Sequence, residues 1–258
     1  MKKFFFLVLT IAFLSSCDKS NLRNECLPTN LQKGVIAFYP FSKGSLDDAT
    51  DADNHLTNPT GAVPIADRNG NTDCAYLLSN SQTNREFLTT ANSDFLNNLD
   101  QFTLSIWYQP MDTTRDGGSI ELLLNRGEES RCSNRRGEWS LALFDCRIPV
   151  FAHDNAVWSN SITGFSGDCQ DEVIAQTDKW HHVVATRNQD NYKIYFNGVL
   201  QNSVDGVANC SDLHLAEDIG DLFIGSEFNG KIDDILIYDR ELTQMEITQL
   251  ADLGTCCQ

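Results

Sequence analysis

Two adjacent carboxylates lie inside an otherwise apolar stretch near the C-terminus, where residues 230–242 read "GKIDDILIYDREL". The Ile, Leu and Tyr content and the charged residues that follow predict a β-strand. Successive side chains of a strand point to opposite faces, so either Asp233 or Asp234 points toward whichever face is buried. We expect this to be Asp233, on the face of Ile235 and Ile237. A buried carboxylate must be ion-paired, hydrogen-bonded or bound to a metal.

A pair of histidines, His181 and His182, lies in the strand-like run "WHHVVATR". Because adjacent strand residues point to opposite faces, the two imidazoles cannot bind one metal ion together. We expect one of them at the edge of the core and the other in solvent. The sequence contains no G-x-S-x-G motif, which would present a nucleophilic serine.

Aromatic residues offer a second kind of chemistry, the stacking of sugar rings. Trp158 lies in a long polar insert near His153 and Asn155, and Trp107 lies on the polar side of its strand. Exposed aromatic rings beside amide and imidazole groups can pack on sugars and hydrogen-bond their hydroxyls. These four residues are therefore candidate glycan ligands. The alternative is that Trp158 anchors its loop and that Trp107 has a structural role.

The elements that must position these residues are short strands. From Val35 onward, runs such as "VIAFYPF", "FTLSIWYQP" and "YKIYFNGVLQNSV" are rich in β-branched and aromatic residues and are separated by Gly, Asn, Asp and Ser. Asn197-Gly198 predicts a hairpin turn. Thr243 and Glu246 form the capping box of a single C-terminal helix. The sequence thus predicts an all-β, two-sheet antiparallel sandwich of the jelly-roll type with one short helix, over residues 34–258.

The first residues, "MKKFFFLVLTIAFLSSC", have a basic start and a short apolar core, which predicts a secretory signal over residues 1–16. The stretch that ends at Cys17 resembles the bacterial lipobox, in which the cysteine is lipidated and becomes the first mature residue. We expect residues 17–33 to form the lipidated cysteine and a polar tether. The protein would then be anchored to the bacterial cell envelope, at the outer membrane and exposed at the cell surface, through lipid alone.

The chain is acidic, with a formal net charge of −17. Such a chain is repelled by nucleic acid and by anionic lipid surfaces, so neither is an expected partner.

Eight cysteines remain after Cys17, an even number that predicts four disulfides in an exported protein. Cys132 and Cys146 flank "EWSLALF" and are the preferred local pair. The adjacent Cys256 and Cys257 would most easily reach two different partners, and Cys26 is a candidate for one of them. The full set is Cys26, Cys74, Cys132, Cys146, Cys169, Cys210, Cys256 and Cys257.

The order of these motifs resembles the laminin-G-like, concanavalin A-like jelly-roll domain of bacterial surface proteins. "IAFYPF", an Asp-rich loop, "FTLSIWYQP", "WHHVVATR", "YKIYFNGVLQ", "LFIG" and "GKIDDILIYDREL" follow one another in that order over residues 35–250. The extra cysteines and the long insert around Trp158 depart from the common pattern.

The resemblance implies a structural Ca²⁺ at the rim of the sandwich. Asp47 stands where relatives have a recurrent aspartate, and Asp51, Asp53 and Asn54 follow it, so these oxygens and Asp233 would form the ligand set. The alternative is that Asp233 accepts hydrogen bonds from backbone N–H groups of that loop without a metal.

The fold implied by the resemblance also hosts glucanases, but the sequence does not favour catalysis. A retaining glycosidase needs two carboxyl groups about 5–5.5 Å apart, and the alternating acid motif that supplies them on this fold is absent. We therefore expect no enzyme activity. The expected function is non-catalytic binding of glycan at the cell envelope; the alternative is a protein–protein adhesion module, and a glycoside hydrolase is the least favoured.

Overall fold

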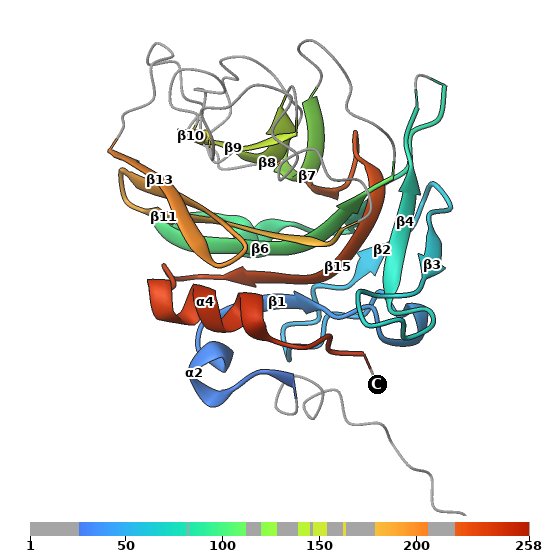
Figure 1. Cartoon of the computed structure of the whole chain (residues 1–258), viewed down its shortest axis with the longest axis horizontal. Helices are drawn as coiled ribbons and strands as arrows, with labels where there is room; N and C mark the ends of the chain where they lie inside the picture. The colour runs from blue at the N-terminus through green and yellow to red at the C-terminus, as the bar shows by residue number, and fades with distance from the viewer. Residues whose placement is uncertain are drawn as a thin grey trace, which may run out of the picture.

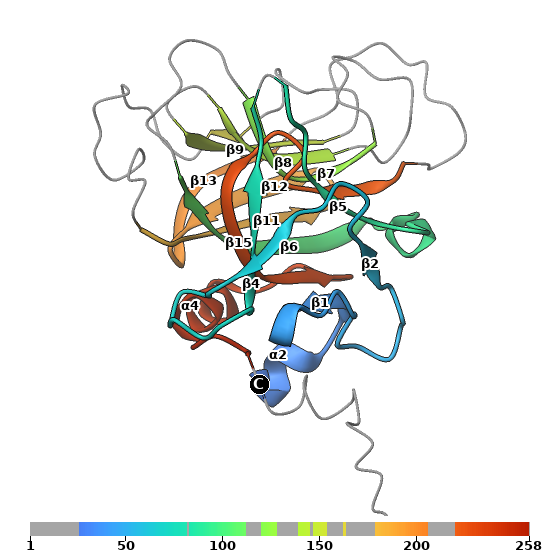
Figure 2. The ribbon, with the colours of Figure 1, turned by 90° about the vertical axis from the view of Figure 1, so that its right-hand side faces the viewer.

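Two antiparallel β-sheets pack face to face, and a layer of helices covers the outer face of one of them (Figure 1). The computed structural model describes residues 26–81, 83–111, 120–127, 139–144, 147–153, 162–163, 179–205 and 220–257. The same order of layers is visible from the side (Figure 2). The predicted two-sheet sandwich with one short C-terminal helix is confirmed.

Sheet A carries the helical layer. In spatial order its strands are β13 (Val199–Asp205), β12 (Asn191–Phe196), β11 (His181–Asn188), β6 (Gln101–Pro110), β15 (Asn229–Tyr238), β4 (Ala75–Ser79) and β3 (Val63–Ile65), and β1 (Val35–Tyr39) also pairs with β15.

Sheet B lies on the other side of the core. Its spatial order is β10 (Ile162–Thr163), β9 (Ile148–His153), β8 (Trp139–Phe144), β7 (Ile120–Arg126), β14 (Leu222–Ile224), β5 (Leu88–Thr90) and β2 (Leu56–Thr57). Two short 3₁₀ turns, Ser42–Gly44 and Asp94–Leu96, lie in the connections.

The main core fills the space between the sheets, and β6 shows how alternation builds it. Phe102, Leu104, Ile106 and Tyr108 point into this core, while the intervening residues point to the outer face of sheet A. Trp107 is one of these outer residues, as its position in the sequence predicted.

The outer face of sheet A has its own apolar cluster, formed with α4 (Gln244–Asp252) and α2 (Thr29–Gln32). Ile247 and Leu250 of α4 pack there with Leu27 and Leu31. Residues 26–33 are thus part of the folded domain, and the prediction that they belong to a tether was wrong. Leu27, just before the N-cap Pro28, and Leu31, inside α2, are both buried in this cluster.

The two local signals read from the sequence are confirmed. Asn197 and Gly198 both have positive φ, 47° and 79°, as the two central residues of a tight hairpin between β12 and β13 require. Thr243 accepts from the Glu246 N–H and the Glu246 side chain accepts from the Thr243 N–H, which completes the capping box of α4. No helix within the described residues combines the length and apolar character needed to cross a membrane.

Strand β15 contains a β-bulge at the aspartates. Asp233 lies opposite Trp107 and Leu236 opposite Ser105, so β15 has one residue more than β6 between these pairs. Asp234 takes the extra position, with φ 37°. The bulge shifts the alternation: Ile235 points into the main core, whereas Asp233, opposite Trp107, points outward. The expectation that Asp233 shares a face with Ile235 and Ile237 was wrong for this reason.

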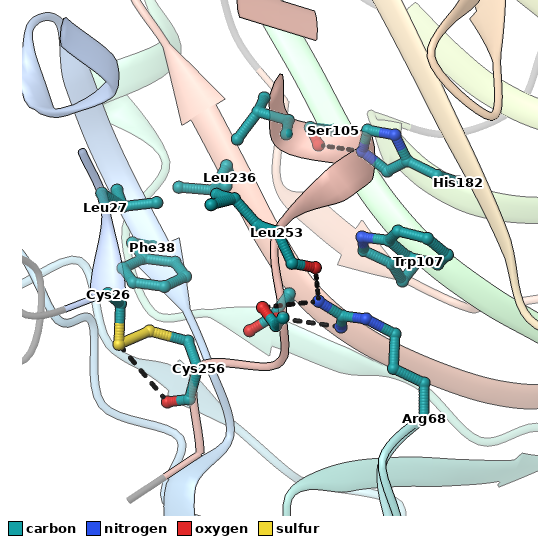
Figure 3. A pocket seen from close by; sticks show the side chains of 13 residues that line it. Cys26, Leu27, Phe38, Arg68, Ser105, Trp107, His182, Leu236, Leu253 and Cys256 are labelled. Atoms are coloured by element: carbon teal, nitrogen blue, oxygen red, sulfur yellow. Dashed lines mark hydrogen bonds and ion pairs between the residues drawn. A yellow bond between two sulfur atoms is a disulfide. The ribbon is translucent and has the colours of Figure 1, made fainter. Parts of the chain in front are cut away.

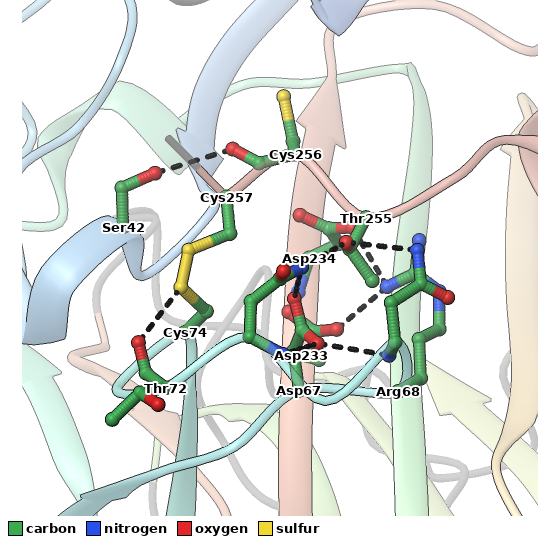
Figure 4. Close-up of a disulfide and its surroundings, with 12 residues drawn as sticks. Ser42, Asp67, Arg68, Thr72, Cys74, Asp233, Asp234, Thr255, Cys256 and Cys257 are labelled. Atoms are coloured by element: carbon green, nitrogen blue, oxygen red, sulfur yellow. Dashed lines mark hydrogen bonds and ion pairs between the residues drawn. A yellow bond between two sulfur atoms is a disulfide. The ribbon is translucent and has the colours of Figure 1, made fainter.

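The adjacent cysteines at the C-terminus form disulfides with two different partners. Cys256 pairs with Cys26 and Cys257 with Cys74. Both bonds hold the C-terminal tail against the domain, Cys26–Cys256 in Figure 3 and Cys74–Cys257 in Figure 4. Cys132, Cys146, Cys169 and Cys210 lie outside the described residues, so the preferred Cys132–Cys146 pair stays a prediction.

The pairing can be checked with single substitutions. Cys256→Ser should release one thiol at Cys26 and leave Cys74 protected, and Cys257→Ser should release Cys74 alone. Alkylation of the denatured, non-reduced variants followed by peptide mass spectrometry reads the result. Release of the opposite thiol in either variant would contradict this connectivity.

Candidate binding site

One arginine, Arg68, forms ion pairs with both central aspartates. Its Nη1 lies 2.6 Å from Asp233 Oδ2 and 2.7 Å from Asp234 Oδ2. Figure 4 shows the guanidinium between these carboxylates and the tail. The Arg68 side chain is 8% exposed and that of Asp233 1%. Burial, and for Asp233 also the negative charge of Asp234, raises the pKa of both carboxyls, while Arg68 opposes the shift.

The guanidinium also ties the tail to the sheet. Arg68 Nη2 donates to the carbonyl oxygens of Leu253, at 3.3 Å, and Gly254, at 3.0 Å. Next to it, Asn69 and Asn71 each donate to the Thr255 hydroxyl at 3.1 Å. The loop that carries Arg68 and the C-terminal tail therefore form one hydrogen-bonded unit over the two aspartates.

The residues predicted to hold calcium are not brought together. Asp47 Oδ1 and Asp53 Oδ1 lie 3.5 and 3.3 Å from the His55 ring, whereas Asp233 binds Arg68. The Asn54 side chain donates to the Ile36 carbonyl, and Asp51 stands exposed in the loop. Among the described residues, the one group with three converging ligand atoms is Asp67 with Cys74 and Cys257, and these two cysteines form a disulfide.

The buried acid of the loop is Asp48, which the sequence analysis did not single out. Its carboxylate accepts from the N–H groups of Phe38, Thr50 and Asn54 at 2.9–3.1 Å. The carboxylate therefore shapes the loop by satisfying its backbone donors. The sequence-based alternative, in which Asp233 accepts hydrogen bonds from backbone N–H groups of this loop, was wrong, because Asp233 pairs with Arg68 and Asp48 accepts from the loop.

Trp107, a predicted glycan ligand, is covered by this network. The Arg68 guanidinium lies 4.5 Å from the centre of the Trp107 ring, and His182 stacks on the same residue at 4.9 Å (Figure 3). These cation–π and stacking contacts occupy the ring. Trp107 is half-buried between these two groups, which favours the structural role over the glycan-binding one.

Both histidines are buried, so the expectation that one lies in solvent was wrong. His181 stacks on Phe196, and His182 bonds to Ser105 through Nε2, 2.8 Å from the hydroxyl. The helical layer and the tail cover the outer face on which His182 lies, whereas His181 packs on the inner face against Phe196 and Tyr108 of the main core, so neither ring reaches water. Burial, with the nearby Arg68 charge, lowers the pKa of His182 to about 3.

Ser105 and His182 are hydrogen-bonded as a catalytic serine and its general base would be, but the space beside them is too small for a substrate. The cavity it lines, with Arg68 and Asp234, has a volume of about 20 Å³ (Figure 3). A space of this size holds about one water molecule. The arrangement therefore stabilises the attachment of the tail and is not a catalytic centre.

A larger, open groove lies at the other end of α4, with a volume of about 340 Å³. One wall is the β12–β13 hairpin, which supplies Lys193, Tyr195 and Leu200, and the other is residues 241–244, between β15 and α4. Small-molecule sites in proteins have volumes of roughly 300–1,000 Å³. This groove is the candidate binding site.

Hydrogen bonds fix the polar groups of the groove. Lys193 Nζ lies 2.6 Å from Glu241 Oε1, and Asn188 Nδ2 donates to Glu241 Oε2 at 2.8 Å. Gln244 Nε2 donates to the Gly198 carbonyl at 2.7 Å and so joins the two walls. Burial and the Glu241 charge raise the pKa of Tyr195 to about 12, so its phenol stays protonated. Ammonium, amide, hydroxyl and carboxylate groups thus surround the exposed Leu200.

None of the groove residues was predicted from the sequence. Of the predicted glycan ligands, Trp158 and Asn155 lie outside the described residues, and His153 is described only as the last residue of β9, without its side chain. The groove depends on a hairpin and a helix start that are about 50 residues apart, and no local pattern marks their contact. The hairpin and capping-box motifs predicted the two segments that form the walls, but they did not predict that these segments contact each other.

The comparisons identify the family. The family model described as the concanavalin A-like lectin/glucanases superfamily (Laminin_G_3) matches residues 81–248. This is more than half of the chain, and the protein therefore belongs to this family. A comparison with curated protein sequences finds no match.

Solved structures share the fold at low sequence identity. The binding domain of botulinum neurotoxin DC, solved with rat synaptotagmin II, is 18% identical with a TM-score of 0.64; the match covers 85% of this chain and 51% of that one. A botulinum neurotoxin type C structure, from work on cell entry through two ganglioside molecules, is 18% identical with a TM-score of 0.65. This match covers 86% of this chain and 52% of that one. The chain thus spans about half of these toxin domains.

A third structure matches over nearly its whole length. Domain 4 of AbnA, a GH43 extracellular arabinanase from Geobacillus stearothermophilus, was solved in complex with arabinotriose. It is 18% identical with a TM-score of 0.60, and the match covers 84% of this chain and 98% of that one. At this identity the likeness establishes the fold.

Removal of the central cation should destabilise the domain. Arg68→Leu leaves two buried carboxylates unpaired and should lower the free energy of unfolding by about 3–5 kcal/mol at neutral pH. Without Arg68, burial holds the folded-state pKa of both groups above the ordinary 3.8, so the folded protein binds protons more tightly than the unfolded chain. The loss should therefore be largest at neutral pH and should shrink as the pH falls toward 4.

Urea unfolding at pH 7 and at pH 4 measures this difference. Arg85→Leu is the control, because Arg85 is 63% exposed and meets Glu227 at the surface; it should change stability by less than about 1 kcal/mol. If Arg68→Leu lowered the free energy of unfolding equally at both pH values, the proposed role of Arg68 as the partner of two buried carboxylates would be wrong.

Proposed function

We propose that this protein is a non-catalytic, lectin-like module that binds glycan in the groove between the β12–β13 hairpin and α4. The observation that carries the proposal is the composition of the groove, in which donors and acceptors are already oriented around an apolar side chain. Sugars offer the complementary chemistry, namely hydroxyls on one edge and C–H surface on the other. A groove whose polar groups are fixed in advance loses little side-chain freedom on binding.

The groove does not suit glycosidic hydrolysis. A glycosidase needs two carboxyl groups on either side of the scissile bond. Glu241 is the one carboxylate among the described residues that line the groove, and Lys193 neutralises it. The structurally similar AbnA domain belongs to an arabinanase, but it is the fourth domain of that enzyme. Its presence there is therefore compatible with a binding role for the fold as well as with a catalytic one.

A protein ligand is the second candidate, and one observation favours it. Val199, Leu200 and Met245 are exposed, and they lie on the hairpin and on α4, the two elements that form the groove. Exposed apolar side chains that gather in one place are typical of protein contacts. The toxin domain solved with rat synaptotagmin II is a precedent for a protein partner on this fold.

The groove can be tested with neighbouring residues of one hairpin. Leu200→Ser should weaken binding of the strongest glycan on an array at least about tenfold, because it removes apolar contact area worth over 1 kcal/mol. Val199→Ser is the matched control, since Val199 is exposed beside it but does not line the groove. Equal effects of the two substitutions, measured by titration calorimetry, would argue against this groove.

We further propose that lipid on Cys17 holds the domain on the bacterial cell envelope, at the outer surface. The support is the sequence before Cys17, with its basic start, apolar core and small residues. Cys17→Ala should move the protein from the membrane fraction to the soluble fraction, because no acyl chain then supplies membrane affinity. Unchanged membrane partitioning of this variant after fractionation would refute the anchor.

A further inference from the structure

We infer that the groove selects neutral or amino-bearing glycans and rejects anionic ones such as sialylated, sulfated or uronic sugars. The inference rests on the proposed function and adds the charge class of the ligand. It follows from the ion pair in the groove, from the contacts of the arginines that the structure describes and from the net charge of the whole chain.

The groove has one cation among its described lining residues, and this cation is already paired. Lys193 Nζ lies 2.6 Å from Glu241 Oε1, with the two side chains 29% and 18% exposed. Asn188 holds the second oxygen of Glu241 at 2.8 Å, which keeps the carboxylate in place. An anionic sugar would have to displace Glu241 from Lys193 or approach both charges together. Neither arrangement gives it a net attraction.

Arginine, the usual partner of carboxylates and sulfates, does not line the groove within the part of the chain that the structure describes. The structure describes six arginines, none of them in the groove lining, and each donates to protein oxygens. The acceptors are carboxylates for Arg68, Arg85, Arg147 and Arg240, and backbone carbonyls for Arg126 and Arg187.

The surroundings of the groove add a repulsive field. The chain has a formal net charge of −17, which disfavours the approach of anions over the distance set by ionic screening. A neutral sugar does not experience this field, and an ammonium group on a sugar is attracted by it.

A glycan array sorted by charge tests the selection. The array contains neutral oligosaccharides, arabinotriose among them, with amino-bearing, uronic, sulfated and sialylated members. Binding confined to neutral or amino-bearing members supports the inference. Strongest binding to an anionic member overturns the inference and leaves the proposed function standing. Binding to no member refutes the proposed function, and the inference falls with it.

Two substitutions that each remove one negative charge show whether the groove is responsible for the charge selectivity. Glu241→Gln frees the Lys193 ammonium and should raise the ratio of uronic to neutral glycan binding about fivefold, the effect of one partly exposed ion pair. Asp252→Asn makes the same change in net charge on an exposed residue of α4 that does not line the groove, and it should leave the ratio unchanged. Equal ratios in the two variants would overturn the assignment to the groove. Circular dichroism spectra of both confirm that they are folded.

Discussion

The pairing of one guanidinium with two buried carboxylates is the constraint on which the outer half of this molecule depends. Arg68 can meet Asp233 and Asp234 together because the bulge in β15 breaks the alternation that would otherwise send them to opposite faces. Buried ion pairs are stable only when further hydrogen bonds satisfy the remaining donors. The tail carbonyls of Leu253 and Gly254 supply these bonds, so the position of the tail follows from the charges beneath it.

The covering of sheet A determines where a ligand can bind. Helix α4 and the tail pack over His182 and beside the half-buried Trp107, so this side of the central strands is largely enclosed. The groove lies at the start of α4, where the β12–β13 hairpin supplies the other wall. Gly198 sets the distance between these two elements, since a Cβ there would lie 3.0 Å from that of Ala251. The groove is therefore a consequence of close hairpin–helix packing.

The sequence allowed the strands, the hairpin turn and the capped helix to be predicted because each depends on near neighbours along the chain. Alternation over Phe102–Tyr108, two residues with positive φ at Asn197 and Gly198, and Thr243 three residues before Glu246 are all local. The partner of Asp233 was not predicted, because Arg68 is 165 residues away and no pattern joins them. The bulge was missed because an extra residue in a strand leaves no mark in composition. The groove was missed because two ordinary segments form it only after folding.

Helix propensity alone cannot stabilise α2 and α4, the two helices of the outer layer. Helix α2 has four residues and α4 nine, whereas isolated helices need about 12–15 residues to be even marginally stable in water. Packing against sheet A supplies part of the missing stability, and the disulfides supply another part by joining Cys26 and Cys74 to the tail. The two disulfides that the structure describes join the tail to the outer side of sheet A, and neither crosses the main core, whose apolar side chains hold the two sheets together. Because the start of α4 is one wall of the groove, the geometry of the proposed ligand site depends on the same bonds that fix the tail.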